Sequence, residues 1–290
     1  MPHPPLCDPP LPIKDSPKAA LPKYSCDTHF HIFDAPSQQV PMRSYTAPHA
    51  PLSDYRQLQN RLGFQRSVIV QPSVYGADNQ TTISVCQTDP NMRAVVVIES
   101  DITDIELQRL SDAGAVGCRV NMLFSSGVNI HDVKALGHKI ANFGWHIQIL
   151  ADVSALADMS ALLQDMPVPI MFDHMGHMPA GKGLQNPDFQ RFCAYLAEGR
   201  IWAKLSAAYR LTSQPDSRYE DVATIVNALI AANPEQLVWG SDWPHPQIKG
   251  QMPDDTKLVN NFLDWIPATY QQDIFAGNAG KFYQFADTVS

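Results

Sequence analysis

Short apolar runs alternate with segments of helical periodicity along nearly the whole chain. Runs rich in β-branched and aromatic residues predict eight strands, at 24–33, 66–71, 93–99, 116–122, 145–150, 170–174, 201–206 and 236–242. The segments between and after them predict helices at 53–62, 80–88, 103–113, 130–142, 153–164, 187–198, 219–232 and 254–265. This alternation is typical of an α/β fold of the (β/α)₈ TIM barrel type, with a doubly wound open sheet as the alternative.

Local signals at the segment ends agree with the alternation. Ser53, Thr103 and Asn186 are predicted to cap helix starts, and glycine follows several predicted helices, as at Gly63 and Gly199. No repeat, low-complexity block or linker indicates a second domain. We therefore predict a proline-rich arm over residues 1–23 and a single barrel domain over residues 24–290.

The first predicted strand carries a pair of histidines in the motif DTHFHIFD. His29 and His31 are two residues apart, and residues i and i+2 of a strand point to the same face. Their imidazoles would therefore converge on one point, where they could bind a divalent metal, polarise a carbonyl or transfer a proton. The isolated histidines His138 and His146 are expected to be structural.

Two further motifs place polar side chains at strand ends, which gather at one face of a barrel. The motif VWGSDWPHP ends the eighth run with Asp242, which suits a general base but could instead cap a turn. The motif MFDHMGH ends the sixth run with His174 and His177, whereas Asp173 is expected to face the other side of the strand and be structural. Three imidazoles and a carboxylate would form a mononuclear metal site or a polar pocket that hydrolyses an ester.

Two arginines are also predicted to lie at strand ends. Arg119 shares a strand face with Asn121 after the fourth run, and Arg210 follows the seventh. A guanidinium directed into a barrel mouth can hold a substrate carboxylate through two hydrogen bonds, although each arginine could instead close a salt bridge to a neighbouring loop. In an acidic protein, a local cationic pocket indicates a small anionic substrate, and Asn121 is a further candidate for binding it.

Composition narrows the class of protein. The net charge is -8 and no cluster of Lys and Arg is present, which argues against nucleic-acid binding. Five widely spaced cysteines without a C-x-x-C pair indicate neither disulfides nor a zinc ribbon, as in a reducing compartment. No membrane span or signal peptide is expected, because long apolar runs are missing. We predict a cytoplasmic protein, either a monomer or a homo-oligomer.

Six ordered motifs resemble the amidohydrolase superfamily, in particular its branch of 2-pyrone-4,6-dicarboxylate, sugar-acid and muconolactone lactonases. They are DTHFHIFD, VIVQPSVYGADN, VGCRVNM, IMFDHMG, WAKLSAAYRL and WGSDWPHP, which together span nearly the whole chain after the arm. The resemblance implies an amidohydrolase-type barrel that opens a small carboxylated or sulfonated lactone. It implies that Asp242 activates the water beside the three histidines, and that the candidates for binding the substrate are Tyr45, Ser73, Tyr75, Arg119 and Arg210.

Two departures from the family patterns affect this interpretation. Metal-rich members carry a lysine after strand 4 and a histidine after strand 5, where this chain has Asn121 and the segment 148–152, so a binuclear centre is not expected. One zinc or manganese ion, or no metal at all, is expected instead. The ligands of that ion would be His29, His31, His174 and Asp242. The pyrone-dicarboxylate pattern also has an arginine where this chain has Ser125, which disfavours that dicarboxylate as the substrate.

The leading prediction is therefore a lactonase in which Asp242 removes a proton from water and the water attacks the lactone carbonyl. The histidines would stabilise the tetrahedral oxyanion. The alternatives are a lactone isomerase that acts on a sugar-acid lactone, a metal-dependent decarboxylase of the same superfamily, and a ligand-binding barrel without activity.

Overall fold

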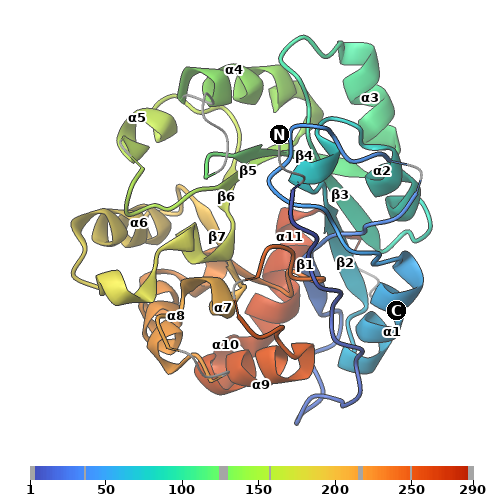
Figure 1. Cartoon of the computed structure of the whole chain (residues 1–290). Helices are drawn as coiled ribbons and strands as arrows, with labels where there is room; N and C mark the ends of the chain where they lie inside the picture. The colour runs from blue at the N-terminus through green and yellow to red at the C-terminus, as the bar shows by residue number, and fades with distance from the viewer. Residues whose placement is uncertain are drawn as a thin grey trace.

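The computed structural model describes residues 4–35, 37–123, 130–156, 158–214, 218–248 and 250–286. Its eight-stranded sheet runs in the order β1 to β8, and each strand pairs in parallel with the next. The strands are β1 (Cys26–Phe30), β2 (Arg66–Val70), β3 (Met92–Val96), β4 (Ala115–Asn121), β5 (His146–Leu150), β6 (Ile170–Phe172), β7 (Trp202–Ser206) and β8 (Leu237–Gly240). The predicted (β/α)₈ barrel is confirmed, with helices around it (Figure 1).

The helices differ from the predicted ones mainly in length and at the C-terminus. They are α1 (Leu52–Leu62), α2 (Gln80–Cys86), α3 (Asp104–Asp112), α4 (Ile130–Ile140), α5 (Met159–Leu163), α6 (Pro187–Ala197), α7 (Ala208–Leu211), α8 (Glu220–Ala232), α9 (Asp255–Trp265), α10 (Ala268–Gln272) and α11 (Asn278–Phe282). The prediction of a helix over 153–164 was wrong for its first half. Asp152 accepts a bond from the Ser154 amide and forms a turn there, and the α5 helix starts later, capped by Asp158.

The predicted helix caps are confirmed in part. Thr103 forms a capping box with Glu106, and the Asn186 side chain accepts bonds from the first amides of α6. Gly63 ends α1 with φ 90, which glycine adopts without strain. The prediction for Ser53 was wrong, because α1 begins one residue earlier and has Pro51 as its N-cap.

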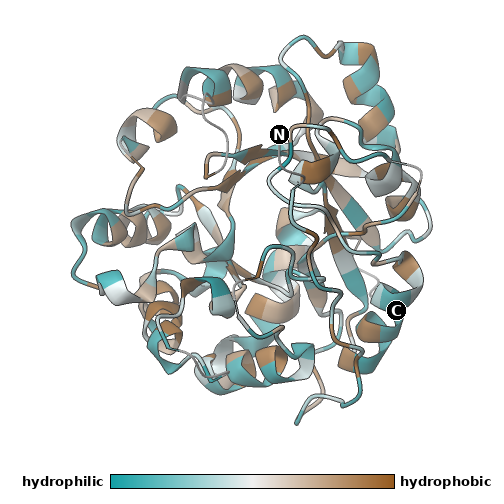
Figure 2. Ribbon diagram, viewed as in Figure 1, coloured by the Kyte–Doolittle hydropathy of each residue, from teal (hydrophilic) through white to brown (hydrophobic). Residues whose placement is uncertain are grey.

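The barrel has two apolar layers, as expected for parallel strands that are buried on both faces. Residues on the outer strand faces, such as Ile170 and Phe172, pack with the helices into the main core. Inside the barrel, Val68, Met171 and Trp202 form a second cluster with Tyr283, which follows α11. Figure 2 shows hydrophobic residues along the strands and on the helix faces turned toward them. Because this apolar cluster fills one end of the barrel interior, the polar side chains gather at the opposite end.

The barrel closes between its first and last strands, β1 and β8, just below the mouth. Gly240 ends β8, and a Cβ atom there would lie 2.8 Å from the Cβ of His29, so only glycine lets the two chains approach this closely. Beyond it, the Asp242 amide donates to the His29 carbonyl at 2.8 Å and the His31 amide donates to the Trp243 carbonyl at 2.7 Å. These bonds fix Asp242 beside the two histidines.

The N-terminal arm lies against the barrel from α9 to the mouth (Figure 1, dark blue). Thr256 donates to the Asp15 carbonyl at 3.0 Å, and the Lys18 amide donates to Asn260 at 2.8 Å. Further up, the Cys7 amide donates to the carbonyl of Thr46, in the loop after β1, at 2.9 Å. Among the described residues, no helix has the length and apolar character that a membrane span requires.

Candidate active site

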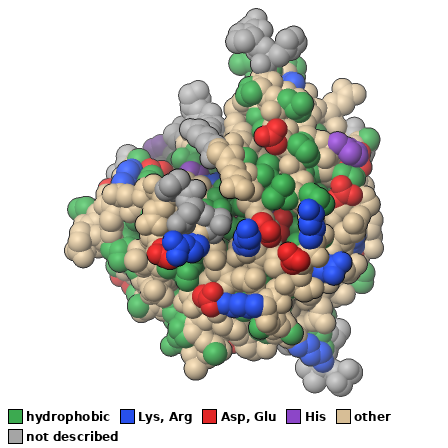
Figure 3. All heavy atoms as spheres, turned by 60° about the horizontal axis from the view of Figure 1, so that its bottom comes forward, with side chains coloured by type: hydrophobic (Ala, Val, Ile, Leu, Met, Phe, Trp, Pro, Cys, Tyr) green, Lys and Arg blue, Asp and Glu red, His purple; other side chains and the backbone are tan. Residues whose placement is uncertain are grey.

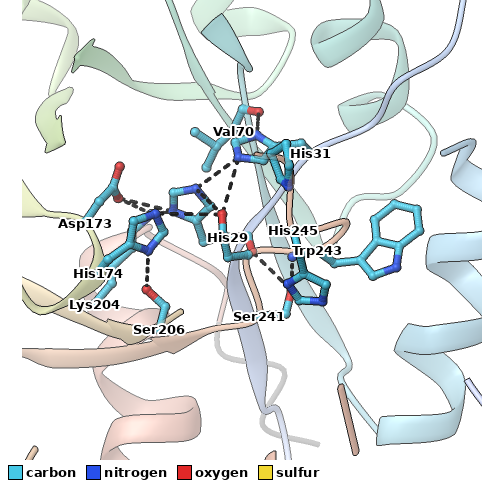
Figure 4. Close-up of polar contacts among 12 residues, drawn as sticks. His29, His31, Val70, Asp173, His174, Lys204, Ser206, Ser241, Trp243 and His245 are labelled. Atoms are coloured by element: carbon cyan, nitrogen blue, oxygen red, sulfur yellow. Dashed lines mark hydrogen bonds and ion pairs between the residues drawn. The ribbon is translucent and has the colours of Figure 1, made fainter. Parts of the chain in front are cut away.

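Three histidines and one aspartate meet at the carboxyl ends of β1, β6 and β8. The Nε2 atoms of His29 and His31 are 3.3 Å apart. Oδ1 of Asp242 lies 3.6, 3.6 and 3.7 Å from Nε2 of His29, His31 and His174, respectively. All four side chains are buried, and Figure 4 shows the imidazoles close together above the strands. The structure therefore brings together the four residues that the sequence predicts as catalytic or metal-binding.

Two of these residues reach the site through unusual backbone conformations. His174 has φ 50 and Asp242 has φ 66, values in the left-handed region that residues other than glycine rarely adopt. Such conformations persist where the surrounding structure holds them, and they cluster at functional sites. For Asp242, the hydrogen bonds between its strand end and β1 provide that hold.

The second ring nitrogens of the histidines determine what the inner nitrogens can do. His31 Nδ1 lies 2.7 Å from the Val70 carbonyl, which can only accept, so Nδ1 carries the proton and Nε2 has a lone pair. His29 Nδ1 lies 3.2 Å from Asp173 Oδ1, and a proton there avoids placing a lone pair against a carboxylate. Burial lowers the pKa of His29 to about 3 and also lowers the pKa of His31, so both rings are neutral near pH 7.

His174 differs from the other two histidines. Its Nδ1 lies 2.8 Å from the hydroxyl of Ser206, which can donate or accept (Figure 4). When Ser206 donates, the proton of a neutral His174 is on Nε2. Burial lowers the pKa of His174 well below its usual value, so this ring is also neutral. His174 is thus the one histidine of the three whose Nε2 can donate a hydrogen bond while the ring is uncharged.

Asp242 is held as a carboxylate. Its Oδ2 accepts hydrogen bonds from the Tyr209 hydroxyl at 2.5 Å and from Arg210 Nε at 2.7 Å. Burial alone would raise its pKa, but the Arg210 guanidinium holds the pKa well below the usual value. The Tyr209 hydroxyl also contacts His245 Nδ1 at 3.0 Å, and His245 Nε2 contacts Asp255 at 3.1 Å. Oδ1 therefore remains available to accept a proton.

The prediction that Asp173 is a structural residue facing away from the site was wrong. Met171 points into the barrel, and Asp173 continues that inward alternation, with Oδ2 3.3 Å from Arg119 Nε. His174 turns inward as well, because its positive φ breaks the alternation. Burial alone would raise the pKa of Asp173. His29 and the Lys204 ammonium outweigh this effect and hold the pKa well below its usual value.

Lys204 is a part of the site that the sequence analysis missed. It lies on β7 and is completely buried. Its Nζ donates to the Thr28 carbonyl at 2.8 Å and to Gln148 Oε1 at 2.7 Å. The same nitrogen lies 3.4 Å from His29 Nδ1 and 3.7 Å from Asp173 Oδ1. A signal was present, because a lysine inside the apolar run WAKLS shares the inward strand face with Trp202 and Ser206.

A small cavity of about 50 Å³ lies over His31, His174 and Asp242, whereas His29 does not line it. Its lining contains nearly all the predicted substrate-binding residues, in the set His31, Tyr45, Ser73, Arg119, Asn121, Leu150, His174, His177, Arg210, Asp242, Pro246 and Gln247. Tyr75 is the exception, because its hydroxyl donates to the Asp34 carbonyl at 3.1 Å and its ring packs on Phe33. Ser125 lies outside the described residues.

The two arginines at the cavity are bound differently. Arg210 makes the salt bridge that the sequence left as its alternative, since Nε bonds to Asp242 and Nη2 donates to the Pro246 carbonyl at 2.7 Å. Arg119 uses Nε for Asp173, and its Nη atoms have no partner among the residues that the structure describes. Arg119 is therefore the better placed of the two to bind an anion.

Comparison with known proteins places the chain in a family. A family model described as amidohydrolase matches residues 26–285. The chain belongs to the amidohydrolase family. This amidohydrolase also resembles a solved structure from Agrobacterium tumefaciens, ATU3138, with a TM-score of 0.85, 26% identity and coverage of 93% of this chain and 99% of the other.

Three curated relatives of this amidohydrolase have names that describe enzymes acting on lactones. It is 31% identical over 286 residues to the 2-pyrone-4,6-dicarboxylate hydrolase of Comamonas testosteroni, with 92% of each chain covered. It is 30% identical to the 4-sulfomuconolactone hydrolase of Hydrogenophaga intermedia, covering 87% of this chain and 86% of the relative. It is 29% identical to the D-galactarolactone isomerase of Agrobacterium fabrum, covering 87% and 88%.

The donor set of this amidohydrolase fits a single divalent cation. The lone pairs of His29 Nε2 and His31 Nε2 face each other and Asp242 Oδ1 across 3.3 to 3.6 Å, an arrangement that repels unless a cation or donor lies between them. The ligand atoms of a tetrahedral zinc site with bonds of about 2.1 Å are roughly 3.4 Å apart. Asp173 and the Val70 carbonyl orient the rings as outer-sphere partners of metal-bound histidines do.

Replacing Lys204 with methionine should lower the free energy of unfolding by about 3 kcal/mol, because it leaves buried oxygen atoms of Thr28, Gln148 and Asp173 without their cation. Urea denaturation monitored by tryptophan fluorescence measures the change. Lys182→Met is the matched control, since Lys182 pairs with Asp152 at the surface and its loss should cost about 1 kcal/mol or less. Equal losses in the two variants would show that the buried lysine is not a special contributor.

Proposed function

We propose that this amidohydrolase opens the ring of a small anionic lactone by hydrolysis. The observation that carries the proposal is the ionised carboxylate of Asp242, buried beside three imidazoles at the barrel mouth. Relatives at 30% and 31% identity that are named as lactone hydrolases support the same reaction. The experiment that tests the proposal is detection of the ring-opened acid from a lactone panel.

Asp242 Oδ1 is placed to act as the general base. It takes a proton from a water molecule, and the water oxygen attacks the lactone carbonyl carbon. The tetrahedral intermediate then collapses, the bond between the carbonyl carbon and the ring oxygen breaks, and the proton on Asp242 passes to the departing ring oxygen. The products are one carboxylate and one hydroxyl or enol group, so the reaction consumes a single water.

His174 is the residue of this cluster best suited to bind the developing oxyanion. Its Nε2 can carry a proton, whereas the protons of neutral His29 and His31 are on Nδ1. A donor fixed by Ser206 in a buried site stabilises negative charge more than the same donor would in water. This assignment narrows the sequence-based prediction, in which all three histidines stabilise the oxyanion.

Arg119 is proposed to hold the anionic group of the substrate. Its side chain is buried, lines the cavity and has its Nη atoms directed to no described partner. A guanidinium binds carboxylate and sulfonate groups through paired hydrogen bonds. On the face of the molecule in Figure 3, Lys and Arg side chains are mixed with Asp and Glu, so the proposal assigns anion recognition to this internal pocket.

We also propose that His29, His31, His174 and Asp242 bind one Zn²⁺ or Mn²⁺. In that form the proton of His174 would be on Nδ1 and donated to Ser206, so that its Nε2 would have a lone pair for the ion, and the ion would replace His174 in stabilising the oxyanion. When bound, the ion would act as a Lewis acid and lower the pKa of a bound water. Elemental mass spectrometry of the purified protein should find one metal ion per chain. Calorimetric titration of Zn²⁺ or Mn²⁺ into protein from which a chelator has removed the metal should give the same stoichiometry. His31→Asn should weaken binding about 100-fold, whereas His138→Asn, an exposed histidine on α4, should not change it. Unchanged binding in His31→Asn would refute the assignment.

A second candidate is a lactone isomerase, which the D-galactarolactone isomerase relative at 29% identity favours. Incubation with carboxylated, sulfonated and sugar-acid lactones, followed by proton NMR, separates the two functions. Hydrolysis gives a ring-opened acid and releases a proton, whereas isomerisation gives a second lactone without acid release. We expect the ring-opened acid. A product that keeps an intact ring, with no acid formed, would establish the isomerase instead.

A further inference from the structure

The catalytic cavity opens into a second, larger chamber that the proposed reaction does not use. The inner cavity of about 50 Å³ and the outer chamber of about 570 Å³ share Tyr45, His177, Arg210 and Gln247 in their linings. Ligand sites in proteins commonly measure roughly 300–1,000 Å³. The inner cavity is below that range and the chamber is within it, so the two together form a site with a small reacting end and a wide entrance.

The N-terminal arm builds one wall of this chamber. Pro5, Leu6 and Cys7 line it. The arm is fastened on both sides of Leu6, because the Thr46 amide donates to the Pro5 carbonyl at 2.7 Å and the Cys7 amide donates to the Thr46 carbonyl at 2.9 Å. The Gln247 amide, in the loop after β8, donates to the Cys7 sulfur at 3.2 Å. The arm therefore bridges the loops after β1 and β8 as a fixed part of the entrance.

The wall presents apolar surface to the chamber. Leu6 is 72% exposed although the backbone on either side of it is hydrogen-bonded. Ile248 and the ring of Tyr209 add apolar surface from the barrel loops. Together Leu6, Tyr209 and Ile248 give the chamber a shared apolar wall beside the inner cavity, and exposed apolar patches rimmed by polar residues mark ligand-binding grooves. Asp8 in the same lining would repel a second anionic group, which leaves the anion to the inner cavity.

We propose that this chamber is a subsite for an uncharged alkyl or aryl substituent on the lactone ring. The inference rests on the proposed lactonase function and specifies its substrate class: an anionic lactone that also carries an apolar group. The reacting carbonyl and the anion enter the inner cavity near Arg119 and Asp242, and the rest of the ring with its substituent extends past Arg210 onto Leu6. The proline-rich arm is then a determinant of specificity.

The test compares two probes, a five-membered unsaturated lactone with a carboxymethyl group and the same lactone with a butyl group on the ring. The value of kcat/KM for each is measured by pH-stat with the full-length enzyme. The wild type should prefer the butyl lactone about tenfold, and Leu6→Asp should remove the preference, because pocket methylenes discriminate about 10- to 200-fold. Leu11→Asp is the matched control, since Leu11 is exposed on the same arm but outside the chamber, and it should keep the preference.

The outcomes separate the subsite from the reaction. Equal kcat/KM for the two lactones in the wild type, or an unchanged preference in Leu6→Asp, would overturn the subsite and leave the lactonase function standing. If neither lactone is opened, the proposed lactonase function is wrong for carboxymethyl lactones of this kind. Calorimetry with the Asp242→Asn variant then judges the subsite alone: about tenfold tighter binding of the butyl lactone supports it, and equal binding overturns it.

Discussion

Asp242→Asn should lower kcat by about two to four orders of magnitude, because a general base contributes roughly that factor and an amide cannot accept the proton from water. The affinity for the lactone should change little, since asparagine has the same shape and can still accept the hydrogen bond from Tyr209. Initial rates on the best lactone of the panel give kcat, and calorimetry of the inactive variant gives the affinity.

The matched control for this variant is Asp112→Asn. Asp112 is an exposed aspartate at the end of α3, which contacts β4 and not the strands that carry the central residues, and its replacement should leave kcat within a factor of two. Circular dichroism and the melting temperature establish that both variants are folded. A folded Asp242→Asn variant that keeps more than a tenth of the wild-type kcat would show that another group activates the water.

Arg119→Met should lower kcat/KM for an anionic lactone by about 100-fold, because a paired hydrogen bond between a guanidinium and an anion is worth roughly 3 kcal/mol in a buried site. Most of the loss should appear in KM, since the anion is bound in the ground state as well as in the transition state. Steady-state kinetics on a lactone with a carboxymethyl group measures both constants.

An uncharged lactone distinguishes anion binding from a structural role, because Arg119 also contacts Asp173. The substitution should change kcat/KM for the uncharged lactone less than threefold. Arg191→Met on α6, where the arginine side chain is 49% exposed, should affect neither substrate. A loss of the same size on charged and uncharged lactones would mean that Arg119 supports Asp173 and does not select the anion.

The fold could be predicted from the sequence because its dominant signal is repeated. All eight strands were predicted, since strands buried on both faces read as continuous apolar runs bounded by polar turns. Helices α7, α10 and α11 were missed. They have four or five residues each, which is too short for a helical period to stand out. Such short helices are stabilised by packing, and Ala279 of α11 lies in the apolar cluster inside the barrel.

The candidate site was predictable where strand alternation holds and not where the backbone turns. His29 and His31 obey the rule that places i and i+2 together. Asp173 and His174 are neighbours that both point inward, because His174 has φ 50, and no residue type at these positions signals that conformation. The carboxylate of Asp173 was therefore assigned to the wrong face.

Long-range contacts limited the rest of the site prediction. Tyr209 and Arg210 bind Asp242 from a short helix after β7, and only the folded barrel brings them to it. The position of the arm was equally hidden, because the bonds that fasten Cys7 join it to Thr46 and Gln247. A proline-rich composition indicates an extended segment but not the surface on which it lies.

In the proposed mechanism, Asp242 activates a water molecule that attacks the lactone carbonyl. The most direct test is a single turnover of the wild-type enzyme in water enriched in ¹⁸O, with the product examined by tandem mass spectrometry. This mechanism predicts one ¹⁸O atom, located in the newly formed carboxylate. A label in the hydroxyl group, or a product without label, would contradict it.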